Sequence, residues 1–329
     1  MTEKPPRYAS WTHGKLPLPE LNEMKRRGEK IVMVTAYDAP GARFAEDSGI
    51  DVILVGDTAA MVVLGHEGTT VPVTIDEMLF LTRTVSRAAR RPIVIGDMPF
   101  GSFQVSDEKA VENAIRFVKE GGADAVKLEG AGPSVSRVRS IVEAGIPVMG
   151  HVGLTPQSAT MLGGFKTQGK TADKARLLVE GALELEEAGA FAVVLEAVPA
   201  PVAAEITQRL SVPTIGIGAG RECDGQVLVY HDLLGLTEGH LPRFVKRYAN
   251  LSREIRDALE DYADEVRSGA FPDDEHTYEM TDDELERFSS RRPSATSPKN
   301  QAKDSPTRPS KILSPSPESD PPLRKTSPP

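Results

Sequence analysis

Residues 121–130 read GGADAVKLEG. The paired glycines can end a helix, because glycine readily adopts the left-handed conformation found just past a helix carboxyl end. A short link then leads into the apolar run 125–129, which finishes on the acid Glu129. A short apolar run without polar alternation is typical of a parallel strand covered on both faces. This stretch therefore predicts one helix-to-strand step of an α/β fold, with a carboxyl group at the strand end.

The same glycine-to-strand step recurs at Gly49, Gly145 and Gly189. Polar groups that end successive parallel strands gather at one edge of the sheet, so we expect the functional site at that edge. Six apolar runs stop at, or one step from, an acid or a histidine: Ile31–Asp38, Val52–Asp57, Pro92–Asp97, Ala125–Glu129, Pro147–His151 and Phe191–Glu196.

Two more runs, Pro213–Gly216 and Gln226–Tyr230, bring the predicted strands to about eight. Eight βα units in roughly 250 residues favour a closed (β/α)8 TIM-type barrel, with an open, doubly wound sheet as the lesser alternative. In such a barrel the catalytic groups belong at the carboxyl ends of the strands, which is where the acids fall.

Two helices between these strands have clear start signals. Thr74 and Glu77 form a capping-box pattern that predicts a helix to about Arg90, and Ser106 can cap the next one. In that second helix we expect one buried stripe, because four apolar residues recur with helical spacing: Val111, Ala114, Ile115 and Val118.

Composition divides the chain into three parts. Residues 1–15 are a polar N-terminal extension, and residues 16–280 have the composition of a catalytic barrel domain. Residues 281–329 form a Ser-, Pro-, Lys- and Arg-rich tail, in which Ser289–Pro329 has only three large aliphatic residues. Such a segment buries too little apolar surface to offset its chain entropy, so we expect disorder.

Charge and cysteine content exclude several classes of protein. The formal net charge of −9 argues against nucleic-acid or anionic-membrane binding as the main task. No run approaches the roughly 20 apolar residues of a membrane span, and no leader pattern is seen, so a cytoplasmic location is expected. Cys223 is the only cysteine, which rules out an internal disulfide. We interpret it as an unpaired loop thiol and not as a nucleophile.

The strand-end acids Asp57, Asp97 and Glu129 offer only oxygen ligands, which suit a hard cation. Magnesium is the best candidate, with Mn²⁺ or Co²⁺ as plausible substitutes, and no zinc-type cluster competes. An isolated strand-end acid would more often be a helix cap, but several together favour a site.

Lys127 and Glu129 are two residues apart on one strand, so their side chains point the same way. Lys127 then neutralises either the site carboxylates or an anionic substrate, with a Schiff-base role as a third alternative. Glu196 ends an apolar strand, where burial should raise its pKa toward that of a general base. The sequence leaves two roles for His151. Its ring either contacts a substrate oxygen or has its hydrogen bonds satisfied inside the barrel.

Two loops exceed the usual length of a connection, residues 58–73 and 153–171, and we expect both to form a substrate rim. The glycine-rich segment 216–220 follows the seventh strand, where barrels often bind phosphate. Its glycines could equally serve close packing.

The motifs together resemble ketopantoate hydroxymethyltransferases, in collinear order from about Leu18 to Tyr278. The residues that carry the resemblance are Thr35–Asp38, Val55–Asp57, Val71–Thr74, Asp97–Phe100, Val126–Gly130, Gly150–Gln157, Gly163–Lys166, Leu195–Glu196, Gly216–Gly220 and Asp224–Gln226.

The resemblance implies a barrel of the phosphoenolpyruvate/pyruvate type in pantothenate and coenzyme A biosynthesis. The family transfers a hydroxymethyl group from 5,10-methylenetetrahydrofolate to 3-methyl-2-oxobutanoate through a Mg²⁺-stabilised enolate, giving 2-dehydropantoate and tetrahydrofolate. Members usually assemble as homodecamers. The implied roles are as follows: metal site, Asp57, Asp97 and Glu129; substrate contacts, Asp57, Thr58, Asp97, Lys127 and, as an open case, His151; proton acceptor, Glu196.

This chain differs from the family pattern in two features, and two other functions compete with the one that the resemblance implies. The family usually has serine where Thr58 stands, and its core has no counterpart of the tail. One rival is a Mg²⁺-dependent carbon–carbon lyase or phosphonomutase of the same superfamily, which generally carries a catalytic cysteine in an active-site loop, and neither long loop of this chain contains a cysteine. The other is a non-catalytic binding protein that works through its tail.

Overall fold

The computed structural model describes residues 14–239 and 241–290. Its eight parallel strands are β1 (Ile31–Thr35), β2 (Val52–Val55), β3 (Ile93–Asp97), β4 (Ala125–Lys127), β5 (Val148–Gly153), β6 (Ala192–Glu196), β7 (Thr214–Ile217) and β8 (Gly225–Leu228). Each strand pairs with the next in chain order, and β8 pairs with β1 to close the barrel. The predicted (β/α)8 barrel is confirmed, and the open sheet is wrong.

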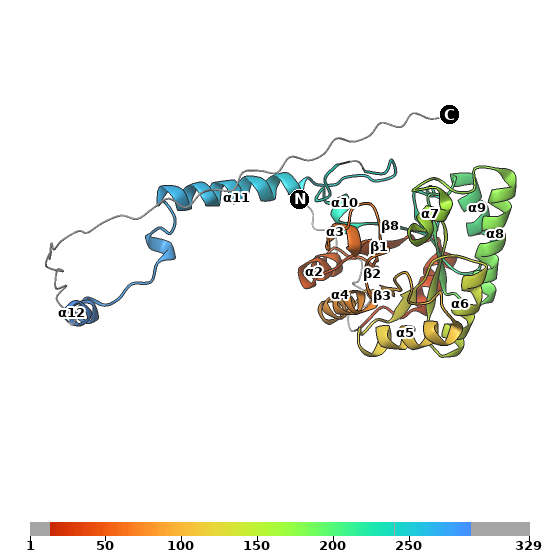
Figure 1. Ribbon diagram of the computed structural model, residues 1–329, viewed down its shortest axis with the longest axis horizontal. Coiled ribbons are helices and arrows are strands. Elements are labelled where there is room, and N and C mark those ends of the chain that lie inside the picture. Colours follow the sequence, from red (N-terminus) through yellow and green to blue (C-terminus); the bar gives the residue numbers. More distant parts are fainter. Residues whose placement is uncertain (1–13, 240, 291–329) are drawn as a thin grey trace, which may run out of the picture. The chain divides into compact units, whose positions relative to one another are not determined.

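Helices cover the outside of this barrel, and Figure 1 shows α2, α4, α5, α6, α8 and α9 around the strands. The α-helices are α1 (Pro19–Arg27), α2 (Ala39–Asp47), α3 (Ala59–Val62), α4 (Ile75–Ala88), α5 (Asp107–Lys119), α6 (Pro133–Glu143), α7 (Ala159–Leu162), α8 (Ala172–Glu187), α9 (Ala200–Arg209), α10 (Tyr230–Leu233), α11 (Leu251–Ser268) and α12 (Asp282–Ser290). Two short 3₁₀ helices are η1 (Pro156–Ser158) and η2 (Asp274–His276).

The predicted start signals of α4 and α5 are confirmed. The Thr74 hydroxyl accepts from the Glu77 N–H while the Glu77 carboxylate accepts from the Thr74 N–H, which completes the capping box. Ser106 caps α5 by accepting from the Lys109 N–H. The glycines before β2, β4, β5 and β6 all have φ between +71° and +98°, the left-handed conformation expected of them.

The predicted buried stripe of α5 is right for Ala114 and wrong for Ile115 and Val118. Ile115 and Val118 are 40% and 38% exposed, whereas the side chains that face the barrel are Ala110, Asn113, Ala114 and Phe117. Both sets have helical spacing, and the observed one wins because Phe117 fits against Gly96 of β3, where a Cβ atom would lie only 2.4 Å from the ring. Local periodicity alone could not choose between the two faces.

The amino end of the barrel is closed by α1. Leu21 and Met24 pack with the apolar residues inside the barrel, among them Ile31 and Ile93. The Lys25 Nζ anchors the helix by donating to the backbone oxygens of Thr207 and Val212 and to Asp224 Oδ2, at 2.9–3.0 Å. Access from this end is blocked, so chemistry has to take place at the carboxyl end.

By its internal contacts the chain separates into two units, Met1–Glu265 and Val266–Pro329. All nine residues of α12 fall where we expected a disordered tail, and this part of the expectation differs from the structure. The helix is favoured by Asp282, Asp283 and Glu284 in its first turn and by an ion pair between Arg287 and Glu284. The remainder of the predicted tail and most of the N-terminal extension lie outside the described residues, and the domain boundaries stay a prediction.

Truncation after Thr281 is expected to leave turnover and melting temperature nearly unchanged. No residue of α12 is buried, and the sequence beyond it carries neither core-forming runs nor a site motif. Steady-state assays and thermal unfolding of the truncated and full-length chains test this. A large loss of activity in the truncated chain would contradict it.

Candidate active site

The polar side chains that end the predicted strands meet at the carboxyl end of the barrel. Most lie at or just beyond the last residue of a strand, whereas His151 lies inside β5. All but Glu196 are at most 5% exposed. The structure brings together the six residues predicted to form the site: Asp57, Asp97, Lys127, Glu129, His151 and Glu196. The other strand-end acid, Asp38, instead caps α2 by accepting from the Gly41 N–H at 2.7 Å.

Asp97 and Lys127 form a buried ion pair that follows from strand register. The pairing of β3 with β4 sets the two residues side by side, and the Lys127 Nζ donates to Asp97 Oδ1 at 2.8 Å and Oδ2 at 2.9 Å. The Glu129 Oε1 lies 4.0 Å from the same nitrogen. The prediction that Lys127 and Glu129 share one side, with carboxylates as neighbours, is confirmed.

Gln157 links three parts of the site, and the sequence reasoning did not assign it a role. Its Nε2 donates to Asp57 Oδ2 at 3.0 Å and to the Met98 carbonyl at 2.9 Å, and its backbone N–H donates to Glu129 Oε2 at 3.0 Å. The side chain comes from η1, in the long loop after β5, and is 6% exposed. The sequence signals that pointed to this segment were the loop length and the family motif Gly150–Gln157, and neither gave Gln157 a role.

Negative charge exceeds positive charge in the buried cluster. Burial raises the pKa of Asp97 to about 7, because the lowering effect of Lys127 is opposed by Asp57. Burial, with repulsion from Asp57, also raises the pKa of Glu129 well above its usual range. Burial alone would lower the pKa of Lys127, but Asp97, Glu129 and Asp57 raise it above its usual value. Such a cluster is suited to an additional cation.

The three predicted metal ligands suit Mg²⁺ by donor type and charge, but their side chains are not arranged around a common point. Their oxygens are the donors that Mg²⁺ prefers, and their surplus of negative charge is buried. Among residues 14–239 and 241–290, however, no three acid, histidine or cysteine side chains converge as a metal site. Both oxygens of Asp97 are engaged by Lys127, and one oxygen each of Asp57 and Glu129 by Gln157. Chemical fit therefore rests on the donor type and the charge.

Glu196 has the property expected of a base. Burial raises the pKa of its carboxyl group to about 7, with Lys127 acting in the opposite direction, although the side chain keeps 16% of its surface exposed. Its Oε2 lies 3.3 Å from His151 Nε2 without the alignment of a hydrogen bond. An acid with a pKa near 7 can both take up and return a proton at neutral pH.

His151 is not satisfied inside the barrel. Within the described part of the chain, neither ring nitrogen has a hydrogen-bond partner, although the side chain is 1% exposed. Burial, followed by the charge of Lys127, lowers the pKa of His151 well below its usual value, so the ring is neutral. Unpartnered buried polar atoms are costly, which favours the interpretation that the ring contacts a ligand.

The backbone directly after Glu196 is held in an unusual conformation. Ala197 has φ +48°, which costs a residue other than glycine roughly 1–3 kcal/mol. Its N–H donates to the Ile217 carbonyl at 2.8 Å, and its carbonyl accepts from the Gln168 N–H at 2.9 Å. These bonds fix the turn at which β6 ends and thereby the direction of the Glu196 side chain.

The glycine-rich segment after β7 serves close packing. A Cβ atom on Gly218 would lie 2.5 Å from the Phe244 ring, and one on Gly220 would lie 2.6 Å from the Ala200 side chain. A Cβ atom on Gly216 would lie 2.9 Å from the Cys223 Sγ. Of the two interpretations left open above, packing accounts for these glycines directly.

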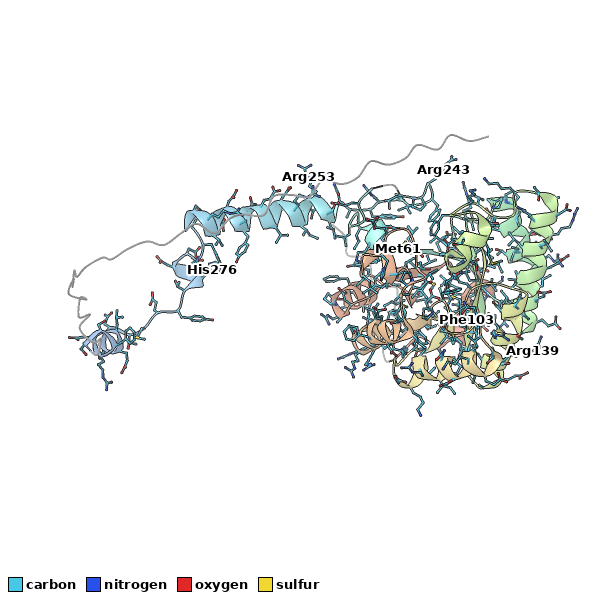
Figure 2. The ribbon with its side chains drawn as sticks, in the orientation of Figure 1. Met61, Phe103, Arg139, Arg243, Arg253 and His276 are labelled. Carbon is cyan, nitrogen blue, oxygen red and sulfur yellow. The ribbon has the colours of Figure 1, made fainter. Side chains whose placement is uncertain are left out.

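A cavity of about 820 Å³ adjoins the cluster. Glu196 and Thr58 lie in its wall, and the Thr58 hydroxyl is held by a 2.7 Å hydrogen bond to Tyr37. Both long loops contribute, the first through Met61 and the second through Lys166, as expected of a substrate rim. Figure 1 shows α3, α7 and α10 at this end of the barrel, and Figure 2 labels Met61 and Arg243 there.

A base with a pKa near 7 beside a buried ammonium group is suited to removing a proton from an anionic carbon acid. Fold and site together thus define an enzyme of the (β/α)8 barrel class. The sequence model of the ketopantoate hydroxymethyltransferase family matches residues 15–274, and the chain belongs to that family.

Curated relatives carry the same activity in their names. The 3-methyl-2-oxobutanoate hydroxymethyltransferase of Moorella thermoacetica is 59% identical over 79% of this chain and 97% of its own length. The protein of that name from Heliobacterium modesticaldum is 55% identical over 82% of this chain and 97% of its own length. The resemblance derived from the motifs is confirmed.

Solved structures with the same fold are more distant. Phosphonopyruvate hydrolase in complex with oxalate and Mg²⁺ is 13% identical, with a TM-score of 0.52 over 83% of this chain and 98% of that one. A 2,3-dimethylmalate lyase of the PEP mutase/isocitrate lyase superfamily is 16% identical, with a TM-score of 0.51 over 83% and 94%. These likenesses show the (β/α)8 barrel fold and nothing finer.

None of the helices in the described residues is long and apolar enough to cross a membrane.

Proposed function

We propose that this protein transfers a hydroxymethyl group from 5,10-methylenetetrahydrofolate to 3-methyl-2-oxobutanoate, giving 2-dehydropantoate and tetrahydrofolate. The observation that carries the proposal is the position of Glu196, an acid with a pKa of about 7 that lies in the wall of the cavity and beside the buried cluster. The chemistry requires a base next to a bound oxo acid, and this arrangement supplies one.

Glu196 acts as the proton acceptor. It takes the C3 proton of the oxo acid, and the electrons of the broken C–H bond form the new carbon–carbon bond to the folate-borne methylene carbon. Water supplies the hydroxyl group as the bond from that carbon to the folate nitrogen breaks, and the nitrogen takes up a proton to give tetrahydrofolate. Lys127 offsets the negative charge of the substrate, and Asp57, Thr58 and Asp97 contact its oxo-acid end. His151, neutral and without a partner, orients a substrate oxygen.

Asp57, Asp97 and Glu129 would hold Mg²⁺. When bound, the ion supplies a Lewis acid for the two oxygens of the oxo acid. Gln157 keeps two of these three carboxylates in fixed positions through its hydrogen bonds, which orients them toward a ligand.

The proposal is tested by incubating the full-length protein with 3-methyl-2-oxobutanoate, 5,10-methylenetetrahydrofolate and Mg²⁺. Formation of 2-dehydropantoate, dependent on each component, is expected. Its absence with correctly folded protein would overturn the proposal.

Mg²⁺ is expected to raise the melting temperature more at pH 8 than at pH 6. A carboxyl group whose pKa is raised by folding stabilises the folded state fully below its unfolded pKa, about 4. For Asp97 this contribution is lost as the pH rises through about 7, because the carboxylates then ionise beside one another. A bound dication relieves that repulsion. Thermal unfolding with Mg²⁺ or with NaCl of equal ionic strength measures the difference, and equal shifts at both pH values would argue against the site.

The rival lyase or phosphonomutase activity is disfavoured by the cysteine of this chain. Cys223 is fully buried near β8, and burial raises its pKa, which opposes formation of a thiolate. The rival binding protein is disfavoured by the intact buried cluster, since no structural need accounts for so many charges there.

We further propose a homodecamer in the cytoplasm, with small molecules as its ligands and with neither nucleic acid nor membrane as a partner.

A further inference from the structure

The wall of the cavity beside Glu196 carries charges of both signs. Asp232 of α10 contributes a carboxylate in addition to Glu196 and Glu238, whereas Lys166 of the loop after α7 and Arg243 of the loop after α10 contribute positive charges. Its volume, about 820 Å³, lies within the range of ligand pockets, roughly 300–1,000 Å³. The ligand that fits it has a hydrogen-bond-donating head and an anionic tail.

Asp232 is positioned to accept two hydrogen bonds from one ligand edge. The Thr237 hydroxyl donates to its Oδ1 at 2.6 Å, which fixes the carboxylate and, among the residues that the structure describes, leaves Oδ2 and the second lone pair of Oδ1 available. A 2-amino-4-oxopyrimidine ring carries two adjacent N–H donors, a geometry that matches a carboxylate. His231 directly precedes Asp232 in α10, and its Nδ1 is buried and has no hydrogen-bond partner within residues 14–239 and 241–290.

Lys166 and Arg243 are available for an anionic group. Within the described parts of the chain, neither forms an ion pair with a carboxylate. The nearby acid Glu238 is already paired with Arg256 at 2.8 Å. A flexible tail that carries carboxylates can therefore reach these cations without displacing a protein partner.

We propose that this cavity binds the reduced folate, with Asp232 accepting from the N3–H and 2-amino groups of the pterin and with Lys166 and Arg243 contacting the glutamate tail. The inference rests on the proposed function. Glu196 and Thr58 lie in the same wall, so the methylene group between pterin and tail is delivered beside the base that activates the oxo acid.

The test compares two probes, tetrahydrofolate and 6-methyltetrahydropterin, which has no tail. Their dissociation constants are measured by anaerobic calorimetry on the full-length protein. Asp232→Asn retains the acceptor for Thr237, and it should weaken both probes by roughly 10–100-fold, the effect of losing hydrogen bonds to a charged group. The double variant Lys166→Met/Arg243→Met should weaken tetrahydrofolate by about fivefold or more and leave the pterin unchanged. Asp47→Asn, an exposed acid at the end of α2, is the matched control.

Turnover assays separate this inference from the proposed function. In Asp232→Asn the KM for methylenetetrahydrofolate should rise about as much as its dissociation constant, while exchange of the oxo-acid C3 hydrogen, which uses no folate, continues. Parental binding of both probes by Asp232→Asn, or equal weakening of both probes by the double variant, would overturn the inference. Failure of the parent protein to form 2-dehydropantoate would instead overturn the proposed function. Should Asp232→Asn not fold, the double variant decides alone.

Discussion

Replacement of Glu196 by glutamine is expected to slow the exchange of the C3 hydrogen of 3-methyl-2-oxobutanoate for deuterium by roughly 10²–10⁴-fold, the usual contribution of a positioned general base. Exchange in D₂O requires only the oxo acid and Mg²⁺, so it isolates proton removal from folate chemistry. Glutamine keeps the shape of the side chain and its place at the end of β6 but cannot accept the proton. NMR spectroscopy of the methine signal measures the rate.

The parent protein should also show a characteristic pH dependence in this assay. Burial raises the pKa of Glu196 to about 7, so the fraction in the carboxylate form grows as the pH rises through that value. Exchange should therefore increase with pH around 7 and level off above it. In Glu196→Gln this inflection should disappear.

Substrate binding should change little in Glu196→Gln, because the Lys127–Asp97 pair remains in place. Glu180→Gln, an exposed glutamate on α8, serves as the matched control and should exchange at the parental rate. Near-parental exchange by Glu196→Gln would transfer the role of base to another group, with His151, 3.3 Å away, as the next candidate.

Substitution of Asp97 is expected to have the second large effect, a fall in turnover of roughly 10²–10³-fold, because a charged group that holds the metal and substrate is lost. The structure determines which substitution to use. Asp97→Ala leaves the buried ammonium of Lys127 without its partner, which should cost about 3–5 kcal/mol of stability. Asp97→Asn keeps one acceptor for that ammonium group while removing the negative charge.

Two measurements separate loss of the site from loss of the fold. Asp97→Asn should unfold in a single cooperative transition, and its melting temperature should no longer rise with Mg²⁺ at pH 8. Asp47→Asn should keep both the parental turnover and the Mg²⁺ response. If Asp97→Asn stayed within a few-fold of the parent at modest Mg²⁺, the assignment of Asp97 to the metal site would be wrong.

Most of the fold could be predicted from the sequence because its signals are local. An apolar run between a helix-ending glycine and a strand-end acid specifies a buried strand, and each of the eight predicted runs overlaps a strand of the barrel. The face of α5 could not be predicted in this way. Ile115 and Val118 are as apolar as a core residue, and only contact with β3 selected Phe117 in their place.

The acids of the site could be predicted for the same reason, since parallel strands end at one rim. The hydrogen bonds that connect these acids could not be predicted. Gln157 reaches Asp57, a residue 100 positions earlier, and no local pattern encodes that distance. The same applies to Asp232, which lies in the cavity wall because α10 follows the last strand of a closed barrel.

The sequence by itself determined the order of strands and helices, the end of the barrel that carries the chemistry, and the family. Only the tertiary structure decided the protonation behaviour of the site. The raised pKa of Asp97 and the neutral ring of His151 arise from burial and from charges on neighbouring strands. Desolvation and Coulombic interaction depend on distances in space, and these exist only once the barrel has closed.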